Sequence, residues 1–587
     1  MLKTLAKSIR EFKGKSILTP ILVAFEVIME CFIPFTAANL IESIREGCEL
    51  DTIVRYGIAL TVMAVISLTF GALAGRTCAT ASTGFARNLR HDLFHRVQGF
   101  SFENIDRFST ASLVTRLTTD VANVQMAYMM IIRTAIRSPF MLIFSLFMAF
   151  YMGGPMALVF VLIIPILGGG LFLVARRVMP LFRRVFRKYD RLNESIEENV
   201  AGMRVVKSFV REDYEKKKFD AAAETVCLDF TKAEKILAFN APLMQLCMYG
   251  VMIFVMYFGS RTIISTVVPE GEIAAFGVGQ MSALLTYGAQ ILFSLMMLSM
   301  ILVMITLSYE SAKRIAEVLN EESTIQNPED PLYTVENGEV EFKNVRFRYA
   351  GGSTSDALSD IHLKIASGET VGILGGTGSS KTTLVQLISR LYDVSGGEVL
   401  VGGHNVREYD LDTLRGEVSV VLQKNLLFSG TIKENLRWGN PSATDEELVA
   451  ACRMAQADEF VSTFPDGYDT YIEQGGTNVS GGQKQRLCIA RALLKKPKIL
   501  ILDDSTSAVD TKTDALIRRA FREYIPETTK IIIAQRVSSV MDADKIVMMD
   551  GGRIVAVGTH EELLSASDIY REIYESQSKG KEENDEN

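Results

Sequence analysis

The sequence has no paired-cysteine motif and no excess of basic residues. Its seven cysteines are scattered over 587 residues without CxxC or metal-ligand spacing, which excludes a disulfide scaffold and gives no sign of a zinc or redox site. Lys and Arg number 62 against 69 Asp and Glu, and this balance excludes a simple nucleic-acid binder. Because hydrophobic residues make up 48% of the chain, a disordered protein is excluded as well.

The charge is divided unevenly along the chain. Residues 1–325 carry 33 Lys and Arg against 28 Asp and Glu, whereas residues 326–587 carry 29 against 41. The mean hydropathy of +0.19 is high for a soluble protein of this length. The sequence therefore predicts an apolar, slightly basic first part and an acidic, globular second part.

Uncharged runs in the first part are long enough to cross a membrane, which takes about 20 apolar residues for one helix. One run, 138–175, is too long for a single helix and contains Gly153-Gly154-Pro155, so we expect two helices joined by a tight turn. We predict six spans in all, at roughly 16–40, 55–78, 136–152, 156–176, 240–262 and 273–306.

The distribution of Arg and Lys orients these spans. Segments 81–125 and 176–235 are rich in basic residues, whereas the short loops 42–54, 153–155 and 263–272 together contain only Arg45. The positive-inside rule places both basic segments and both termini in the cytoplasm of a multi-pass protein. Residues 1–15 resemble an interfacial helix, and the two long segments are expected to extend the helices below the bilayer as stalks.

Two carboxylates lie inside the first span. Glu26 and Glu30 are four residues apart and share one face of a helix. A carboxylate at membrane depth is costly unless it contacts water, a partner or a proton. Two interpretations stay open: a lining of a transport cavity that attracts cationic substrates, or an interhelical contact that is hydrated or neutralised.

The second part contains a phosphate-binding loop between a strand and a helix. The strand Thr370–Leu374 is followed by Gly375-Gly376-Thr377-Gly378-Ser379-Ser380-Lys381-Thr382-Thr383. In this setting backbone N–H groups cradle phosphates, Lys381 reaches the β- and γ-phosphates, and Thr382 offers an oxygen to Mg²⁺. Ser380 replaces the usual glycine before the lysine, and a positive φ there would cost about 1 kcal/mol.

A buried strand later in the chain ends in two acids, Asp503 and Asp504. This is a Walker B arrangement, in which Asp503 holds Mg²⁺. Between the two motifs lie Gln423 and Ser480-Gly481-Gly482-Gln483, and Ser507-Ala508-Val509-Asp510 comes after them. This ordered set resembles the nucleotide-binding domain of ABC transporters, and the spans ahead of it resemble the exporter type.

The resemblance implies a fold class and a set of site residues. It predicts a multi-domain membrane protein with an all-α six-helix transmembrane domain, long cytoplasmic helical extensions and an α/β P-loop ATPase domain. Tyr349 would stack on the adenine of ATP, Gln423 would sense Mg²⁺ and the γ-phosphate, and Asp510 would belong to the D-loop. Ser480, Gly481, Gly482 and Gln483 would cap the ATP held by the opposite subunit.

The same resemblance sets the expected boundaries. An elbow helix would cover 1–15, the transmembrane domain 16–320, a linker 321–338, the nucleotide-binding domain 339–575 and an acidic tail 576–587. Coupling helices would lie near 102–107 and 211–214. The expected partners are a second half-subunit, the lipid bilayer and a hydrophobic or amphipathic small molecule.

Three positions depart from the family pattern on one side of the site. Asp504 stands where a catalytic glutamate is usual, Gln535 stands where a switch histidine is usual, and Ser380 alters the P-loop. One methylene fewer at position 504 withdraws the base by about 1.5 Å, and poor positioning of a base costs roughly 10²–10⁴ in rate. An amide at position 535 carries no proton switch.

This asymmetry resembles the degenerate-site subunit of bacterial heterodimeric multidrug exporters. The chain is then expected to be an ATP-hydrolysing translocase subunit of the plasma (inner) membrane with a weak site of its own and an intact signature that completes its partner's site. Two alternatives remain: a homodimeric lipid or peptide exporter with Asp504 as a weak base, and an ATP-gated regulatory protein that does not pump.

Overall fold

The computed structural model describes residues 1–265, 276–349, 355–504 and 509–585. They form two compact units. The first contains 1–98 and 111–321, and the second contains 99–110 and 322–587. The break after Glu321 lies at the start of the expected linker, whereas the assignment of 99–110 to the second unit was not anticipated from the sequence.

The described part of the first unit is built from helices. Their bounds are α1 Leu2–Ala6, η1 Lys7–Phe12, α2 Lys13–Arg45, α3 Leu50–Gln98, α5 Thr110–Thr115, η2 Arg116–Asp120, α6 Val121–Ile132, α7 Thr134–Gly153, η3 Gly154–Ala157, α8 Leu158–Ala201, α9 Met203–Ser208, α10 Glu212–Leu237, α11 Asn240–Ser265 and α12 Val278–Asn320.

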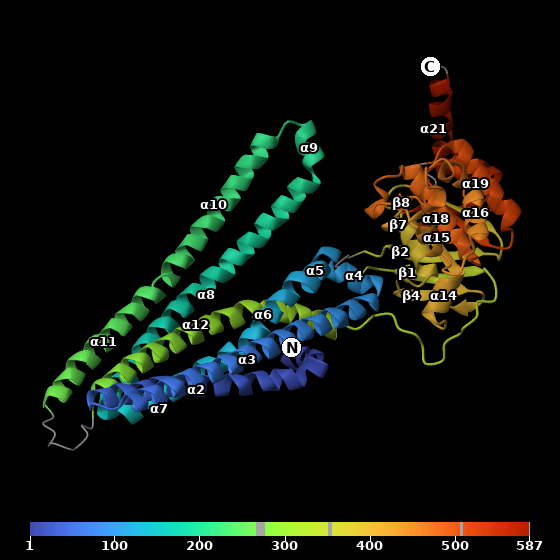
Figure 1. The fold of residues 1–587 in the computed structure, drawn as a ribbon. Helices are drawn as coiled ribbons and strands as arrows, with labels where there is room; N and C mark the ends of the chain where they lie inside the picture. Colours follow the sequence, from blue (N-terminus) through green and yellow to red (C-terminus); the bar gives the residue numbers. More distant parts are fainter. Residues whose placement is uncertain (266–275, 350–354, 505–508, 586–587) are drawn as a thin grey trace. The chain divides into compact units, whose positions relative to one another are not determined.

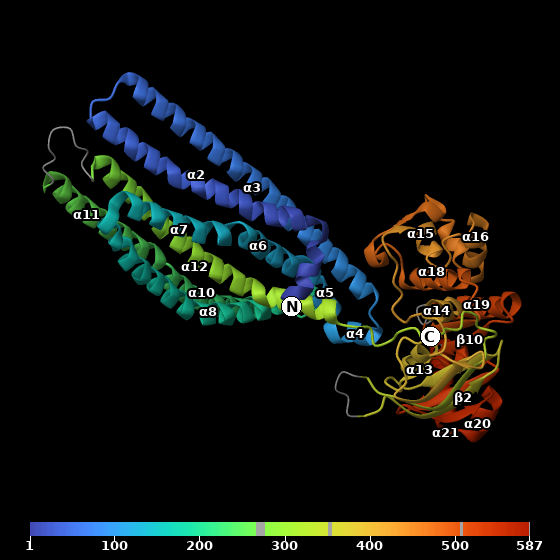
Figure 2. The same cartoon turned by 90° about the horizontal axis from the view of Figure 1, so that it is seen from below.

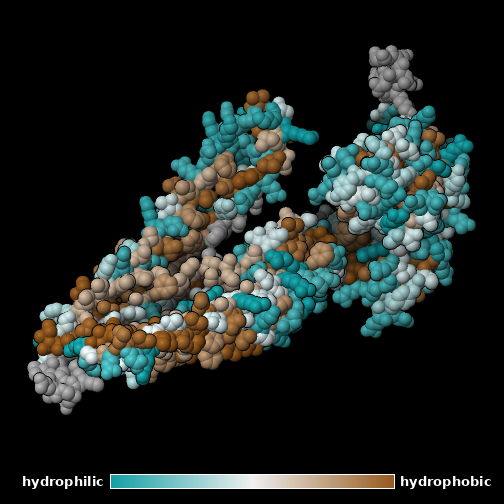
Figure 3. Space-filling model, in the orientation of Figure 1, coloured by the Kyte–Doolittle hydropathy of each residue, from teal (hydrophilic) through white to brown (hydrophobic). Residues whose placement is uncertain are grey.

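Long helices run side by side through this unit, as Figures 1 and 2 show for α2 with α3 and for α8 with α10. Their shared core is apolar and includes Val27, Ala149, Phe160, Val255 and Tyr287, drawn from five different helices. Stretches without charge can form such helices because every backbone group is satisfied within its own segment. Figure 3 shows apolar residues covering much of the visible face of this unit.

Five helical segments among the described residues are long and apolar enough to cross a membrane: Leu2–Arg45, Leu50–Gln98, Thr110–Val185, Glu212–Ser265 and Val278–Asn320. The third contains two of the predicted spans. They are separated at Gly153-Gly154-Pro155, where Gly154 has φ +48° and the short helix η3 turns the chain. The first residues of the predicted span 273–306 lie outside the described part of the chain. Most of loop 263–272 lies outside it as well.

The second unit combines α4 Phe102–Phe108 with an α/β domain. Its strands are β1 Val340–Phe347, β2 Leu358–Ile365, β3 Thr370–Gly375, β4 Gly396–Val401, β5 His404–Asn405, β6 Val418–Val421, β7 Gly430–Thr431, β8 Tyr471–Ile472, β9 Ile499–Asp503, β10 Thr529–Ile533, β11 Lys545–Asp550 and β12 Arg553–Gly558. Its helices beyond α4 are α13 Lys381–Ile388, α14 Leu411–Glu417, α15 Ile432–Arg437, α16 Asp445–Met454, α17 Asp458–Val461, α18 Gly481–Leu494, α19 Thr511–Tyr524, α20 His560–Ala566 and α21 Asp568–Asp585, with short 3₁₀ turns at Gly467–Asp469, Gln474–Gly476 and Val537–Ser539.

A six-stranded sheet organises this domain. The strand order is β12-β11-β3-β10-β9-β6, and the strands from β11 to β6 pair in parallel. Strands β9 and β10 are buried at every position, as expected for parallel strands covered on both faces. A separate antiparallel sheet has the order β2-β1-β4-β5.

The two ends of the chain are helical where they are described, and the cysteines form no disulfides among the described residues. The predicted elbow 1–15 is divided among α1, η1 and the first turn of α2, and Ser8 donates a hydrogen bond to Asp92 of α3 at 2.7 Å. The predicted tail 576–587 begins inside α21, and its side chains from 578 onward lie outside the described residues. All seven cysteines are free thiols, and five of them are buried.

Candidate functional site

Four parallel strands carry the predicted nucleotide motifs to one edge of the sheet. Strands β3, β10, β9 and β6 are neighbours in that order. The P-loop follows β3, Gln535 follows β10, Asp504 follows β9 and Gln423 follows β6. Since the carboxyl ends of parallel strands share one edge, residues up to 160 positions apart in the chain meet there.

These residues line a single cavity of about 520 Å³. Of the predicted site residues, its walls include Gly375, Gly376, Thr377, Gly378, Ser380, Lys381, Thr382, Thr383, Gln423, Asp503, Asp504 and Gln535. Ser379 lies in the same loop with its hydroxyl donated to the Gly376 carbonyl at 2.8 Å. The cavity therefore joins the groups that were expected to hold phosphates and metal.

The P-loop lysine folds back over its own loop. Lys381 Nζ donates to the carbonyl oxygens of Gly375 at 2.9 Å and Gly376 at 2.8 Å, and to Ser379 Oγ at 3.2 Å. Burial lowers the pKa of this ammonium, whereas the nearby Asp503 and Asp504 oppose the shift. A phosphate group in the loop would offer Lys381 a fully charged acceptor in place of these neutral oxygens.

Ser380 occupies a left-handed backbone conformation, with φ +67° and ψ +26°. A residue with a Cβ is strained there, whereas glycine adopts the conformation freely. Ser380 precedes α13, but its side chain makes no capping hydrogen bond that would offset the strain. The positive φ expected at Ser380 from the sequence is therefore present in the structure.

The proposed metal ligands lie in contact. Thr382 Oγ1 donates to the Asp503 carboxylate, at 2.9 Å to Oδ2 and 3.1 Å to Oδ1. Asp503 is 3% exposed, and this burial raises the pKa of its carboxyl group. Hydroxyl, carboxylate and amide oxygens are the ligands that Mg²⁺ prefers, and Thr382, Asp503 and Gln423 supply one of each kind in this cavity.

Asp504 is held by two side-chain amides. Its Oδ2 accepts a hydrogen bond from Gln535 Nε2 at 3.0 Å and from Gln423 Nε2 at 3.3 Å. Its backbone is left-handed, with φ +49°, and its N–H donates to the Ile533 carbonyl at 3.0 Å. Asp504, Gln423 and Gln535 therefore form a hydrogen-bonded group, the Asp504 clamp, in which two amides hold one oxygen of the carboxylate.

Tyr349 does not line this cavity but lies beside the P-loop helix. Its hydroxyl is 3.0 Å from Thr383 Oγ1. Its ring makes edge contacts with Phe347 at 4.8 Å and with Tyr392 at 5.4 Å between ring centroids. Tyr392 was missed by sequence reasoning, because no motif marks it.

Tyr392 connects this aromatic group to α4. Its hydroxyl donates to Asp106 Oδ2 at 2.6 Å, and its ring lies 6.1 Å from that of Phe102. Burial and the neighbouring Asp106 raise the pKa of the Tyr392 hydroxyl, so it stays protonated as the donor. The expected coupling segment 102–107 thus coincides with the short helix α4, which contacts Tyr392 in the same compact unit.

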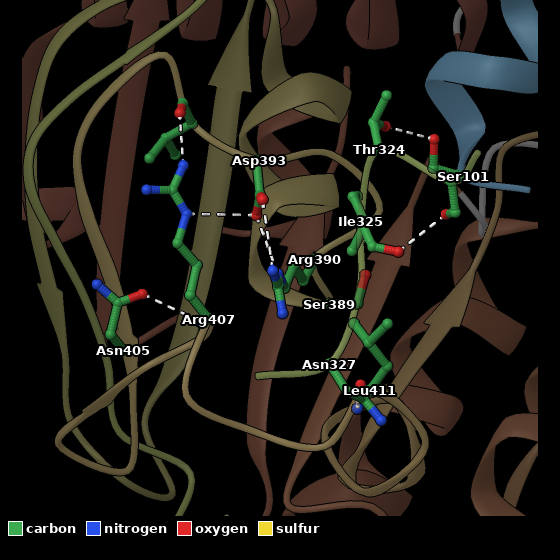
Figure 4. Close-up of polar contacts among 12 residues, drawn as sticks. Ser101, Thr324, Ile325, Asn327, Ser389, Arg390, Asp393, Asn405, Arg407 and Leu411 are labelled. Atoms are coloured by element: carbon green, nitrogen blue, oxygen red, sulfur yellow. Dashed lines mark hydrogen bonds and ion pairs between the residues drawn. The ribbon is translucent and has the colours of Figure 1, made fainter. Parts of the chain in front are cut away.

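The linker also holds α4. Ser101 and Asn104 form a capping box at the start of α4. Ser101 Oγ lies 2.7 Å from Thr324 Oγ1, and Asn104 Nδ2 donates to the Glu322 carbonyl at 3.1 Å. Figure 4 shows the Ser101–Thr324 contact beside the loop in which Asp393 binds Arg390 and Arg407.

The signature residues lie outside the cavity, at the start of α18. Ser480 Oγ accepts from the Gln483 N–H at 3.3 Å, and Gln483 Oε1 accepts from the Ser480 N–H at 2.9 Å. Ser480 and Gly481 are exposed. The first N–H groups of an α-helix have no partner within the helix, and such a helix start suits a phosphate.

The predicted D-loop is described only in part. Asp510 caps α19 by accepting from the Thr513 N–H at 2.9 Å, and this backbone hydrogen bond lowers the pKa of its carboxyl group. Ser507 and Ala508 lie outside the described residues.

Comparison with known proteins identifies the family. Residues 16–295 match the family model of the ABC transporter transmembrane region, and residues 358–507 match the family model described as ABC transporter. The uncharacterized ABC transporter ATP-binding protein YfiB of Bacillus subtilis is 35% identical over 557 residues, 95% of each chain. The chain belongs to the ABC transporter family.

Two further relatives extend the comparison. The ATP-dependent lipid A-core flippase of Desulfotalea psychrophila is 32% identical over 500 residues, 84% of each chain. A bacterial Atm1-family ABC exporter with ATP bound superimposes with a TM-score of 0.82 over 97% of this chain and 98% of the other, at 23% identity.

These findings confirm the predicted fold class. The transporter has a helical transmembrane domain followed by an α/β nucleotide-binding domain. It binds ATP, and its hydrolysis of ATP is coupled to transport across the membrane. ABC exporters act as dimers in the membrane, so a second half-subunit belongs to the working assembly.

In the transmembrane domain, Glu26 and Glu30 of α2 both contact Arg137 of α7. Arg137 Nη1 lies 2.5 Å from Glu26 Oε1, and Nη2 lies 2.7 Å from Glu30 Oε2. Sequence reasoning missed Arg137 because it is more than 100 residues away and stands just before an uncharged run. The two carboxylates therefore share one ion-pair partner on a neighbouring helix.

The second segment expected to be a coupling helix, 211–214, lies where the long helix α10 begins. The short helix between the long helices α8 and α10 is α9, Met203–Ser208, whereas 211–214 covers the loop residue Arg211 and the start of α10. Arg211 stacks over the ring of Tyr214 at 5.3 Å.

Proposed function

We propose that this chain is the degenerate-site subunit of a heterodimeric ABC exporter in a bacterial plasma membrane. Its own P-loop side would bind ATP and hydrolyse it slowly, and Ser480-Gly481-Gly482-Gln483 would complete the active site of a different partner. The observation that carries the proposal is the clamp on Asp504, whose Oδ2 accepts hydrogen bonds from both Gln423 and Gln535.

The clamp opposes general-base catalysis in two ways. A base must point its free lone pair at the attacking water, whereas Asp504 Oδ2 is directed at two amides. The carboxylate also carries one methylene fewer than glutamate, so it stays closer to its backbone. Gln535 donates a hydrogen bond in this arrangement but cannot exchange a proton near pH 7 as histidine does.

ATP binding itself is supported by the remaining groups. Lys381 and the loop N–H groups would hold the phosphates, and Tyr349 would stack on the adenine. Thr382, Asp503 and Gln423 would hold Mg²⁺, which neutralises phosphate charge when bound. The Asp503 carboxyl is buried beside Thr382, with which it would share the metal.

The expected cycle uses the two half-sites differently. ATP binding would close the two nucleotide domains, and α4 together with the turn at α9 would transmit that closure to the membrane helices. Hydrolysis at the partner's P-loop would then reset the transporter. The cargo would be a hydrophobic or amphipathic small molecule, as the multidrug type exports.

A homodimeric lipid exporter is the second candidate. The 32% identity to a protein named as a lipid A-core flippase favours it. In that case Asp504 would act as a weak base in two identical sites, and the chain by itself would move lipid between leaflets.

The two candidates are separated by ATPase rates of the purified chain alone. We expect slow turnover from the unaltered chain, and a rise of at least about tenfold when Asp504→Glu and Gln535→His are combined, because a positioned base contributes 10²–10⁴ in rate. Asp466→Glu adds the same methylene at an exposed site and should change nothing. Fast turnover by the unaltered chain, unaffected by the double substitution, would contradict the proposal.

A further inference from the structure

Glu26, Glu30 and Arg137 form an ionic cluster between two membrane helices. Arg137 bonds one oxygen of Glu26 at 2.5 Å and both oxygens of Glu30 at 2.7 and 2.8 Å. Glu26 stands 13 residues beyond the start of α2 at Lys13, which is about 20 Å along the helix axis. The cluster therefore lies well inside the apolar part of α2.

The charges in this cluster do not balance. Two carboxylates share one guanidinium, which leaves a formal charge of −1. Glu26 is 6% exposed, and its Oε2 is buried without a hydrogen-bond partner among the described residues. An uncompensated carboxylate in hydrocarbon is costly, so the cluster favours one more positive group.

The cluster is closed on one side and open on another. The backbone of α3 approaches Glu26 so closely that a Cβ on Gly71 would stand 2.9 Å from Glu26 Oε1. In contrast, the side chains of Arg137 and Glu30 are 32% and 26% exposed. A cation can therefore approach from the surface of the helical unit without entering its core.

Aromatic rings continue this open face along α7. Phe140 and Phe144 follow Arg137 by three and seven residues, and so share its side of the helix. Their rings stack with centroids 6.2 Å apart, and Phe140 is 40% exposed. A ligand with a positive group at the carboxylates would place an apolar body against these rings.

We propose that this cluster is a substrate site for amphipathic monovalent cations, with Arg137 as the resident cation that the substrate displaces. The inference rests on the proposed export of small molecules and names their charge class. Arg137 holds the two carboxylates together. An arriving cation takes its place between Glu26 and Glu30, and the guanidinium moves away on its exposed side.

The proposal makes opposite predictions for the two kinds of residue. Removing a carboxylate removes attraction for the substrate, whereas removing Arg137 removes its competitor. A merely structural ion pair would respond in the same direction to either loss, since each breaks the same contact.

The test is binding of radiolabelled tetraphenylphosphonium to the full-length chain in lipid nanodiscs without nucleotide. Tetraphenylborate, which has the same shape and the opposite charge, serves as the matched probe. We expect Glu26→Gln and Glu30→Gln each to weaken binding of the cation by at least about tenfold, and Arg137→Gln to strengthen it several-fold. Tetraphenylborate should bind weakly to the unaltered chain.

Glu42→Gln is the matched control. Glu42 is also buried on α2 and paired with an arginine, Arg45, at 2.9 Å, and its loss should leave binding unchanged. Thermal unfolding identifies any variant that fails to fold. If Glu26→Gln fails to fold, Glu30→Gln at the more exposed carboxylate still tests the proposal.

Two results would overturn the site: equal affinity for both probes in the unaltered chain, or weaker cation binding in Arg137→Gln. Because this measurement needs no ATP hydrolysis, its outcome is independent of whether the Asp504 half-site is impaired. Failure of one proposal leaves the other open to its own test.

Discussion

The nucleotide-binding domain has two faces that are expected to contact ATP, and their residues are held differently. The signature face contains Ser480 to Gln483, and the phosphate face contains the P-loop, Asp503 and Asp504. On the signature face, Ser480 and Gln483 cap α18 reciprocally, and each residue type suits its position. On the phosphate face, Ser380 and Asp504 both adopt left-handed backbone conformations, with φ +67° and +49°. Such strain concentrates at functional sites, and here it coincides with the departures from the family pattern.

The comparison teaches that fold and catalytic competence depend on different residues. The strands β3, β9 and β10 are buried and regular on the phosphate face. The departures from the family pattern fall in the loops after these strands, where they leave the sheet intact. A domain with such changes keeps its architecture and its nucleotide cavity.

The largest expected effect comes from breaking the signature face in the assembled pair. Gly481→Asp would place a carboxylate where the partner's ATP is expected to bind, and we expect ATPase activity of the pair to fall at least about 10²-fold. Asp504→Asn, on the other face, should reduce it less than about twofold. Steady-state ATPase assays on the co-expressed subunits measure both.

Gly416→Asp is the control for Gly481→Asp, since a Cβ at position 416 contacts nothing within 4 Å. Similar losses in Gly481→Asp and Asp504→Asn would show that both faces hydrolyse ATP equally, and the comparison would fail.

A smaller effect is expected at the contact between Tyr392 and Asp106 of α4. Tyr392→Phe keeps the ring against Tyr349 and Phe102 but removes the hydroxyl that donates to Asp106. A hydrogen bond to a charged group contributes about 1.5–3 kcal/mol, so we expect stimulation of ATPase by transported compounds to drop about tenfold while ATP affinity stays within twofold. Fluorescent-nucleotide binding and stimulated ATPase assays separate the two quantities.

Asp106→Asn is the companion variant, because its amide oxygen still accepts the hydrogen bond and the loss should be milder. An unchanged stimulation in Tyr392→Phe would mean that α4 does not depend on this contact.

The smallest effect concerns the strained P-loop. Ser380→Gly relieves a left-handed conformation that costs a residue with a Cβ about 1–2 kcal/mol. The greater freedom of glycine in the unfolded chain offsets about 0.4–1 kcal/mol of this, so the expected net gain is about 0.5–1 kcal/mol. We expect the unfolding midpoint of the nucleotide-binding domain to rise by about 2–3 °C. The single tryptophan, Trp438, belongs to this domain and reports its unfolding by fluorescence. An equal or lower midpoint would contradict the assignment of strain to Ser380.

Local patterns predicted much of the candidate nucleotide site. The strand, glycine loop and helix around Lys381 form as expected, because turn chemistry and apolar periodicity act over a few residues. The meeting of Asp504, Gln535 and Gln423 was inferred from the family resemblance, and the adjacent parallel strands supply its physical reason. The segment 211–214, expected from the resemblance to be a coupling helix, belongs to the start of α10, and the separate short helix α9 before it was not expected.

The long-range partners were beyond the reach of such patterns. Arg137 gave no sign of its contact with Glu26, and Tyr392 gave none of its hydrogen bond to Asp106. Their partners are 111 and 286 residues away. Nothing in the local periodicity of either segment specifies which side chain will face it after packing.

The sequence by itself determined which segments are apolar enough for membrane helices, and which loops bind phosphate, because these properties depend on neighbours in the chain. Only the tertiary structure decided how the charges are paired: one guanidinium between two carboxylates, and one carboxylate between two amides. Those pairings depend on helix packing and strand order, which bring distant residues within hydrogen-bond distance.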